Sequence, residues 1–376
     1  MALGSIAGAI THRVENTSRI DTHIHVLTPS YLAALNESGG DPSGWPTPSW
    51  TLENCVRFCD TIGSSFSVLS VTAPGPALLG PTEEGRRLAR TLNQEVWDVC
   101  QQRPGRFGFF ASLPDFNDVE GTIAEIKAIF ETEKKANGVI VMTSYGDKLV
   151  GDEAFRPIWN ELDKHGALVF VHPSHVKVTP EKIGGFLPQP VIDYPLATTR
   201  AAMSLILSGV MTNCSKIEVI LSHAGGTFPF LAQRGVGALM DSTIAEQSEV
   251  NIIQGRVAMS RFWYDIALST SKAQLKALLA TASPSRIVFG SDFPYAPTPA
   301  IYAGLLQYSL FAKTAEGSPI RPAELHKNAA VLLRAHALQN SFLPHDEGEE
   351  VKMREPEFGL EENDDAAQAR EQLDQH

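Results

Sequence analysis

The chain has 376 residues, of which 43% are hydrophobic and 20% charged, and its formal net charge is -12. This is an ordinary globular composition, and the length suits one large domain. The acidic balance and the lack of a basic stripe argue against nucleic-acid binding, and no apolar run is long enough for a membrane span.

Both ends of the chain differ from its body. Residues 1–18 lack a long apolar segment, so we expect a disordered extension and no secretory signal. Residues 344–376 hold twelve acidic side chains against three basic ones, which is about nine of the twelve net negative charges. We expect this tail to be disordered. The cysteines lack CxxC spacing and are interpreted as reduced thiols of a cytoplasmic protein: Cys55, Cys59, Cys100 and Cys214.

Short apolar runs typical of buried strands recur along the chain. They lie at residues 20–26, 66–71, 107–111, 138–143, 167–172, 217–223, 262–266 and 287–292. Helical patterns lie between and after them, at residues 83–102, 119–135, 154–165, 192–212, 271–281 and 322–338. This alternation predicts a parallel sheet covered on both faces. Eight such units indicate an α/β fold, a (β/α)8 TIM barrel over residues 19–340.

Two insertions interrupt the predicted barrel. The segment 28–61 is rich in glycine and proline and contains the sequence GGDPSGW. A loop of this length is often a lid or wall of a site, although a surface excursion is the alternative. A second insertion, 174–190, follows the fifth predicted strand.

The first predicted strand carries the sequence DTHIH. Side chains alternate faces along a strand, so Asp21, His23 and His25 point the same way. Two imidazoles so placed can converge on one metal ion. Taken alone, the pair is equally compatible with a coincidence in a half-buried strand.

Three other predicted strands also end in polar residues. The fifth ends at His172, the sixth at His223 and the eighth at Asp292. The carboxyl ends of the strands form the active-site face of such a barrel. The fourth strand ends at Thr143 and supplies neither a lysine nor an acid. Convergence of four strands on one mouth favours a functional site over packing.

The segments DTHIH, FVHP, LSHAGG and FGSDFPYAP resemble the amidohydrolase superfamily. They are most similar to its decarboxylase branch, which includes aminocarboxymuconate-semialdehyde, γ-resorcylate and isoorotate decarboxylases. Within that branch, GGDPSGW, SVTAPGP, AFRPIW, LPQP, DYP and RAAM resemble the fungal 6-methylsalicylate decarboxylases, and the similarity spans residues 20–338. The chain departs from its relatives after DYP, where Ala197-Thr198 replaces a Glu-Thr pair.

The resemblance implies one divalent metal ion with four ligands: His23, His25, His172 and Asp292. Three imidazoles and a carboxylate suit Zn²⁺, with Mn²⁺ as the alternative. The missing lysine on the fourth strand fits a single-metal site. His223 is then an acid/base or polarising group beside the metal, or a hydrogen-bond partner that fixes Asp292. The family also implies a homodimer.

The implied reaction is metal-dependent, non-oxidative decarboxylation of a 2-hydroxybenzoate, namely 6-methylsalicylate to 3-methylphenol and CO2 in polyketide secondary metabolism. We expect Asp292 to protonate the ring carbon, with His223 activating or holding it. Candidate walls for the aromatic ring are Trp45, Trp50, Phe293 and Tyr295, and candidate partners for the substrate carboxylate are Arg200 and Arg234.

Three alternatives remain open at this point. The same ligands could activate water in a hydrolase of a lactone or an amide. A decarboxylase could act on another aromatic acid, of the resorcylate or uracil carboxylate type. A barrel could also bind a metal or metabolite without catalysis. Release of CO2 without consumption of water would separate the first alternative from decarboxylation.

Overall fold

The computed structural model describes residues 18–345. The extension predicted for the N-terminus, apart from Ser18, and the acidic tail beyond His345 lie outside the described residues. Within residues 18–345, every helix is too short or too polar to cross a bilayer.

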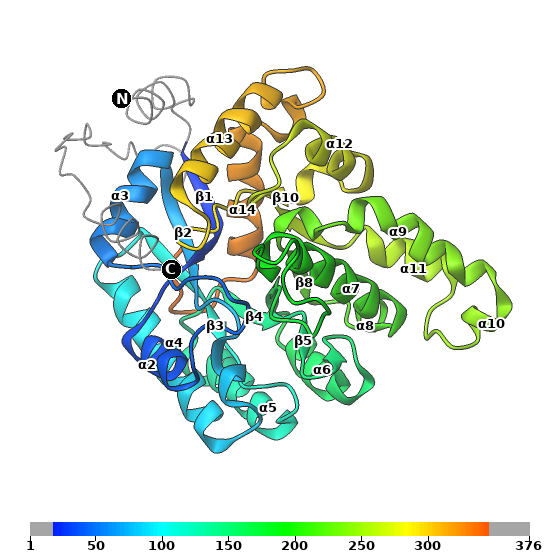
Figure 1. The fold of residues 1–376 in the computed structure, drawn as a ribbon, viewed down its shortest axis with the longest axis horizontal. Coiled ribbons are helices and arrows are strands. Elements are labelled where there is room, and N and C mark those ends of the chain that lie inside the picture. Colours follow the sequence, from blue (N-terminus) through cyan, green and yellow to red (C-terminus); the bar gives the residue numbers. More distant parts are fainter. Residues whose placement is uncertain (1–17, 346–376) are drawn as a thin grey trace.

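Eight parallel strands form one sheet, in which neighbours in the sheet are also neighbours in sequence. They are β1 (Arg19–His25), β2 (Ser64–Ser70), β3 (Phe107–Ser112), β4 (Gly138–Met142), β7 (Leu168–His172), β8 (Glu218–Leu221), β9 (Trp263–Asp265) and β10 (Ile287–Val288). The chain that continues β10 returns to β1, because Thr22 N donates to Phe289 O at 3.0 Å and His25 N donates to Phe293 O at 2.7 Å. The predicted (β/α)8 barrel is therefore confirmed (Figure 1).

Helices surround the strands on the outside of the barrel (Figure 1). They are α2 (Pro29–Glu37), α3 (Leu52–Ile62), α4 (Glu83–Gln101), α5 (Val119–Lys127), α6 (Arg156–Lys164), α7 (Asp193–Leu207), α8 (Val210–Asn213), α9 (Phe228–Gly237), α10 (Ser242–Ala245), α11 (Ile252–Met259), α12 (Lys272–Thr281), α13 (Thr298–Ala312) and α14 (Pro322–Ala335). A small hairpin of β5 (Ser144–Tyr145) and β6 (Lys148–Leu149) follows β4. Every residue of β7 is buried, as expected for a parallel strand covered on both faces.

Two of the predicted strands end two or more residues before their expected carboxyl ends. The sixth ends at Leu221 instead of His223, and the eighth ends at Val288 instead of Asp292. His223 has φ 55° and Asp292 has φ 63°, which lie in the left-handed region and cannot continue a β-ladder. His223 and Asp292, whose side chains lie at the candidate site, therefore have a backbone conformation that differs from that of a strand.

The insertion predicted over residues 28–61 is not a continuous loop, because it contains α2 and α3. Pro29 starts α2, and the Thr51 hydroxyl caps α3 by accepting from Asn54 N at 3.1 Å. Only residues 38–51 between the two helices are irregular. The second insertion, 174–190, contains a single short bridge between Ile183 and Leu187.

The helix predicted over residues 119–135 changes type part of the way along. It is α-helical to Lys127 and continues as a π-helix, η2 (Ala128–Glu133). The helix predicted over residues 192–212 is divided into α7 and α8 at Gly209, which has φ 74°. Six helices of the described chain were not predicted as ranges: α2, α3, α9, α10, α11 and α13.

Candidate metal centre

Three histidines and one aspartate meet at the carboxyl ends of the strands. β1 is buried along its whole length and directs His23 and His25 to the same side, with ring centroids 5.1 Å apart. His172, at the end of β7, lies 4.8 Å from the His25 ring. One potential ligand atom from each of His23, His25, His172 and Asp292 lies within 4.8 Å of the others. The structure thus brings together all four residues that the resemblance implied.

Asp292 reaches this cluster because the chain after β10 passes very close to β1. Asp292 N donates to His23 O at 2.7 Å. Gly290 makes this approach possible, since a Cβ at that position would lie 2.6 Å from the Cβ of His23. The glycine and aspartate of the FGSD sequence therefore have linked roles: one permits the contact and the other supplies the carboxylate.

The hydrogen bonds of the two β1 histidines leave their Nε2 atoms available. His23 Nδ1 lies 2.9 Å from Asp265 Oδ2, and His25 Nδ1 lies 3.1 Å from Ser70 Oγ. Both Nε2 atoms, and Nδ1 of His172, are buried and have no hydrogen-bond partner among residues 18–345. An imidazole held through one nitrogen presents the other as a metal ligand. These three nitrogens are the orphaned groups that a cation would satisfy.

The spacing around Asp292 also fits a cation. His25 Nε2 and His23 Nε2 lie 3.2 and 3.4 Å from Asp292 Oδ1. These distances are at or beyond the long end of N–H···O hydrogen bonds. Two ligands bound at 2.0–2.1 Å to a tetrahedral Zn²⁺ lie about 3.3 Å apart. The donor set and its spacing therefore fit a single divalent ion.

The electrostatics of the cluster favour the same donor set. Burial lowers the pKa of His25, and burial together with the neighbouring imidazoles holds the pKa of His172 well below its usual value. Burial alone would raise the pKa of Asp292, but His23 and His25 hold it well below the ordinary range. Burial would lower the pKa of His23, but the carboxylates of Asp265 and Asp292 raise it to about 10. Two neutral imidazoles and a carboxylate anion are thus present at neutral pH.

Asp265, at the end of β9, is a site residue that the sequence interpretation missed. It is fully buried, and its Oδ2 contacts the ring of His23. Its Oδ1 accepts from His223 N at 3.1 Å and from Ala267 N at 2.8 Å. The signal was present, because an aspartate ends the strand sequence FWYD just as His172 ends its own strand.

His223 lies beside the four ligands. Its Nδ1 lies 3.1 Å from Ala267 O, which leaves Nε2 free, and its ring centroid is 4.8 Å from that of His23. Burial and the neighbouring His23 lower its pKa, so it is neutral at pH 7. Among the described residues, no hydrogen bond joins His223 to Asp292, so the alternative that His223 fixes this carboxylate has no support in the geometry.

The four aromatic residues proposed as ring walls occupy different environments. The Tyr295 ring stands edge-on to His25 at 5.8 Å, and its hydroxyl is buried without a partner. Phe293 instead stacks on Phe58 at 4.1 Å, and Trp50 packs against the core. Trp45 is half-buried in the irregular segment 38–51. Of the four, Tyr295 has a contact with the cluster.

The two candidate arginines are exposed side chains on helices. Arg200 on α7 and Arg234 on α9 are exposed, and within residues 18–345 neither contacts the histidine cluster. Their assignment as carboxylate partners stays a prediction.

Asp41 was not predicted as a site residue, although it lies in the GGDPSGW sequence. Burial raises the pKa of Asp41 itself. Burial also raises the pKa of Tyr194 and of Tyr295, and the charges of Asp41 and Asp292 act on both phenols in the same direction. The irregular segment 38–51 therefore contributes an acidic group whose charge acts on Tyr194 and Tyr295.

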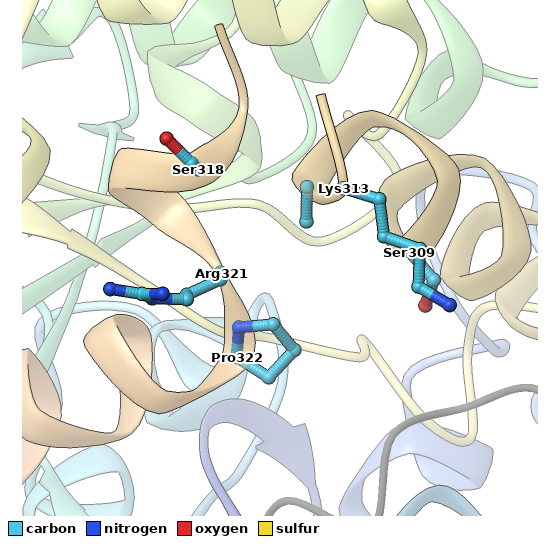
Figure 2. Close-up of a pocket in the computed structure, with 6 residues that line it drawn as sticks. Ser309, Lys313, Ser318, Arg321 and Pro322 are labelled. Carbon is cyan, nitrogen blue, oxygen red and sulfur yellow. The ribbon is translucent and has the colours of Figure 1, made fainter. Parts of the chain in front are cut away.

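A separate pocket lies between the end of α13 and the start of α14. Its lining residues are Ser309, Ala312, Lys313, Ser318, Arg321 and Pro322 (Figure 2). Ser318 donates to Ala315 O, and Arg321 pairs with Glu324. None of the residues of the histidine cluster lines this pocket, so we assign it no part in the chemistry.

Comparison with known proteins identifies the family to which this chain belongs. The family model described as "Amidohydrolase" matches residues 20–335. The chain belongs to the amidohydrolase family, whose members bind a divalent metal ion. The solved structure of a protein named Amidohydrolase II superposes with a TM-score of 0.74 and 27% identity, covering 84% of this chain and 100% of that one.

The similar proteins also define the type of reaction. The chain is 40% identical to 6-methylsalicylic acid decarboxylase of Penicillium expansum, over 76% of this chain and 87% of that protein. The fold also matches 5-carboxyvanillate decarboxylase of Novosphingobium aromaticivorans, complexed with manganese and 4-hydroxy-3-methoxy-5-nitrobenzoic acid. That match has a TM-score of 0.72 at 17% identity and covers 85% of this chain and 97% of the other. The chain is accordingly a carboxy-lyase.

Proposed function

We propose that the chain decarboxylates 6-methylsalicylate to 3-methylphenol and CO2, as part of polyketide secondary metabolism, at one divalent metal ion held by His23, His25, His172 and Asp292. The observation that carries the proposal is this cluster of buried, unpartnered donor atoms at the mouth of the barrel. The 40% identity to a 6-methylsalicylic acid decarboxylase supports the choice of substrate. We take Zn²⁺ as the ion and Mn²⁺ as the alternative.

The bound ion supplies Lewis-acid stabilisation to the phenolate and carboxylate oxygens of a 2-hydroxybenzoate. The remaining requirement is a proton for the ring carbon that bears the carboxylate. When that carbon is protonated, the bond to the carboxyl group breaks, its electron pair returns to the ring, and CO2 leaves. One proton is consumed for each carboxylate lost.

Asp292 is the proposed proton donor to carbon: its carboxylate would first take the proton of the substrate's phenol group and then pass it to the ring carbon. Both β1 imidazoles face its Oδ1, and its side chain keeps some exposure, which leaves Oδ2 available to the substrate. His223, anchored through Nδ1 to Ala267 O, keeps Nε2 free to polarise the substrate or to act as an acid or base beside it. The buried, unpartnered Tyr295 hydroxyl borders the same space and contributes one wall for the ring.

The direct test is to incubate the purified protein with 6-methylsalicylate and to follow 3-methylphenol and CO2 together. Treatment with a chelator should remove activity, and added Zn²⁺ or Mn²⁺ should restore it. In D2O, the deuterium should appear at the ring position that carried the carboxylate. Full activity of the metal-free protein would contradict the metal's role, and CO2 release from another aromatic acid alone would contradict the substrate.

Metal binding is expected to release about one proton near neutral pH. His23 has a pKa of about 10 without metal, so its Nε2 must lose a proton before it can become a ligand. This cost falls as the pH rises toward that pKa, so the apparent affinity for Zn²⁺ should increase about tenfold per pH unit between about pH 6 and 8. Calorimetry in buffers of different ionisation enthalpy measures the released proton, and a pH-independent affinity would refute this expectation.

We also propose that the chain is a homodimer that buries an exposed apolar surface. This surface consists of Phe230, Met240, Ile244, Ile253 and Val257, and Met240 and Ile253 are 78% and 71% exposed. Its elements α9, α10 and α11 extend beyond the ring of helices (Figure 1), and α9 packs on α11. Apolar patches of this kind are typical of protein–protein contacts.

Substitution within the apolar surface should separate the two copies. The double variant Ile253→Asp and Val257→Asp adds two charges to the exposed face of α11 and should give a monomer by light scattering. Val331→Asp is the matched control, because Val331 is 57% exposed on α14, outside the apolar surface, and this variant should remain dimeric. A wild-type monomer at micromolar concentration would contradict the proposal.

A further inference from the structure

A second group of possible metal ligands lies at the opposite end of β7 from the catalytic cluster. His165 follows the last turn of α6, and Glu161 lies one turn earlier in the same helix. Glu131 comes from the π-helical turn η2, which packs beside them. One potential ligand atom from each of the three residues lies within 4.8 Å of the others. Neither the family match nor the proposed reaction uses these residues.

The distances in this group repeat those of the catalytic cluster. His165 Nε2 lies 3.4 Å from Glu161 Oε1 and 3.6 Å from Glu131 Oε1. Both exceed the usual N–H···O range, and the Nε2 atom is buried with no hydrogen-bond partner. His23 Nε2 is likewise unpartnered and lies 3.4 Å from Asp292 Oδ1. Ligands of one tetrahedral cation are separated by about 3.3 Å, so this spacing matches the edges of a coordination shell.

The surroundings hold two of the three side chains in place. Glu161 and His165 have side chains only 6% and 17% exposed. Phe130 stacks on the His165 ring at 5.2 Å with an interplanar angle of 12°, which fixes the direction of Nε2. Lys164 Nζ forms an ion pair with Glu161 Oε2 at 2.6 Å. The other oxygen of this carboxylate, Oε1, faces His165. Glu131 is 56% exposed and closes the group from the solvent side.

We infer that Glu131, Glu161 and His165 form a second site for a divalent transition-metal cation. One imidazole and two carboxylates suit Zn²⁺, with water completing the coordination. The cation would link η2 to α6 on the outside of the barrel, and its two carboxylate ligands would neutralise its charge. The site is structural, because β7 separates it from His172 and the chemistry at the other end.

Counting bound Zn²⁺ tests the inference. The full-length protein, first stripped with a chelator and then titrated with Zn²⁺ against a competing chromogenic chelator, should bind two equivalents. His165→Gln should bind one equivalent and keep the wild-type decarboxylation rate. His25→Ala should also bind one equivalent but lose activity. The count does not depend on the identity of the substrate, and the two variants assign each equivalent to its own site, so a failure of the second site is distinguishable from a failure of the catalytic site.

Substitution of the exposed Glu131 shows whether a lost equivalent reflects the site itself or misfolding of the His165 variant. Glu131→Gln changes a mainly exposed side chain and should also remove one equivalent, whereas Glu120→Gln, an exposed glutamate at the start of α5, should keep both. Lys164→Gln frees Glu161 Oε2 for the cation and should tighten the second binding event several-fold. A single equivalent in the wild-type protein that His165→Gln retains, or two equivalents in both His165→Gln and Glu131→Gln, would overturn the inference.

Discussion

Asp292→Asn is expected to abolish both metal binding and decarboxylation. Asp292 provides the only carboxylate among the four clustered residues, and its Oδ1 faces the Nε2 atoms of His23 and His25 at 3.4 and 3.2 Å. An amide in its place removes the negative charge that offsets the divalent ion. It also removes the group proposed to carry the proton to the ring carbon. The expected loss of turnover is therefore complete within the detection limit of the assay.

His223→Ala should have a different result, namely unchanged metal content with a rate reduced by about 10²–10⁴-fold. The His223 ring lies 4.8 Å from that of His23 but is not one of the four residues that share a common point. The carbonyl of Ala267 holds Nδ1 of His223 and thereby orients its Nε2. Because this Nε2 is not a proposed metal ligand, removal of the ring should leave the ion bound.

Elemental analysis of the two purified variants, together with their kcat, distinguishes these roles. If both variants lose the metal equally, His223 is a ligand. If His223→Ala turns over at the wild-type rate, it has no part in proton transfer. Either result would require a new assignment of the acid that protonates the ring.

The barrel and the cluster of His23, His25, His172 and Asp292 could be predicted because their signals are local. In β1 the alternation of side chains places His23 and His25 on one side whatever the rest of the chain does. In β7 a continuous apolar run ends at a histidine, and parallel strands bring such ends together. The ladder from β1 to β10 then follows the order of the strands in the sequence.

Other features depend on tertiary contacts that no local pattern reports. The exposure of Arg200 and Arg234 depends on how α7 and α9 are rotated against the barrel, and both face solvent. The helices α2 and α3 were hidden by the glycine- and proline-rich stretch between them. Asp265 was missed although its strand was predicted, because the apolar run continues to Ile266 and so placed the aspartate inside the predicted strand, whereas β9 ends at Asp265.

Asp265→Asn is expected to weaken Zn²⁺ binding by about 10–100-fold, although Asp265 does not belong to the four-ligand group. The reason is the tautomer of His23. Asp265 Oδ1 accepts two backbone N–H groups, from His223 and Ala267, and this contact decides how an asparagine would be oriented. Its carbonyl oxygen must remain at the Oδ1 position, which places its NH2 group against Nδ1 of His23. His23 must then accept at Nδ1 and carry its proton on Nε2, the atom that the metal needs.

Ser70→Ala provides the matched comparison, because it removes the hydroxyl beside His25 Nδ1 while the carbonyl of Ser70 remains 3.3 Å from the same nitrogen. The tautomer of His25 is therefore preserved, and Zn²⁺ affinity should change much less than in Asp265→Asn. The measurement is a competition titration on metal-free protein whose melting temperature has been checked for each variant. Equal losses of affinity in the two variants, at equal stability, would show that a neutral contact orients a ligand as well as the carboxylate does. A wild-type affinity in Asp265→Asn would show that the carboxylate does not set the proton of His23.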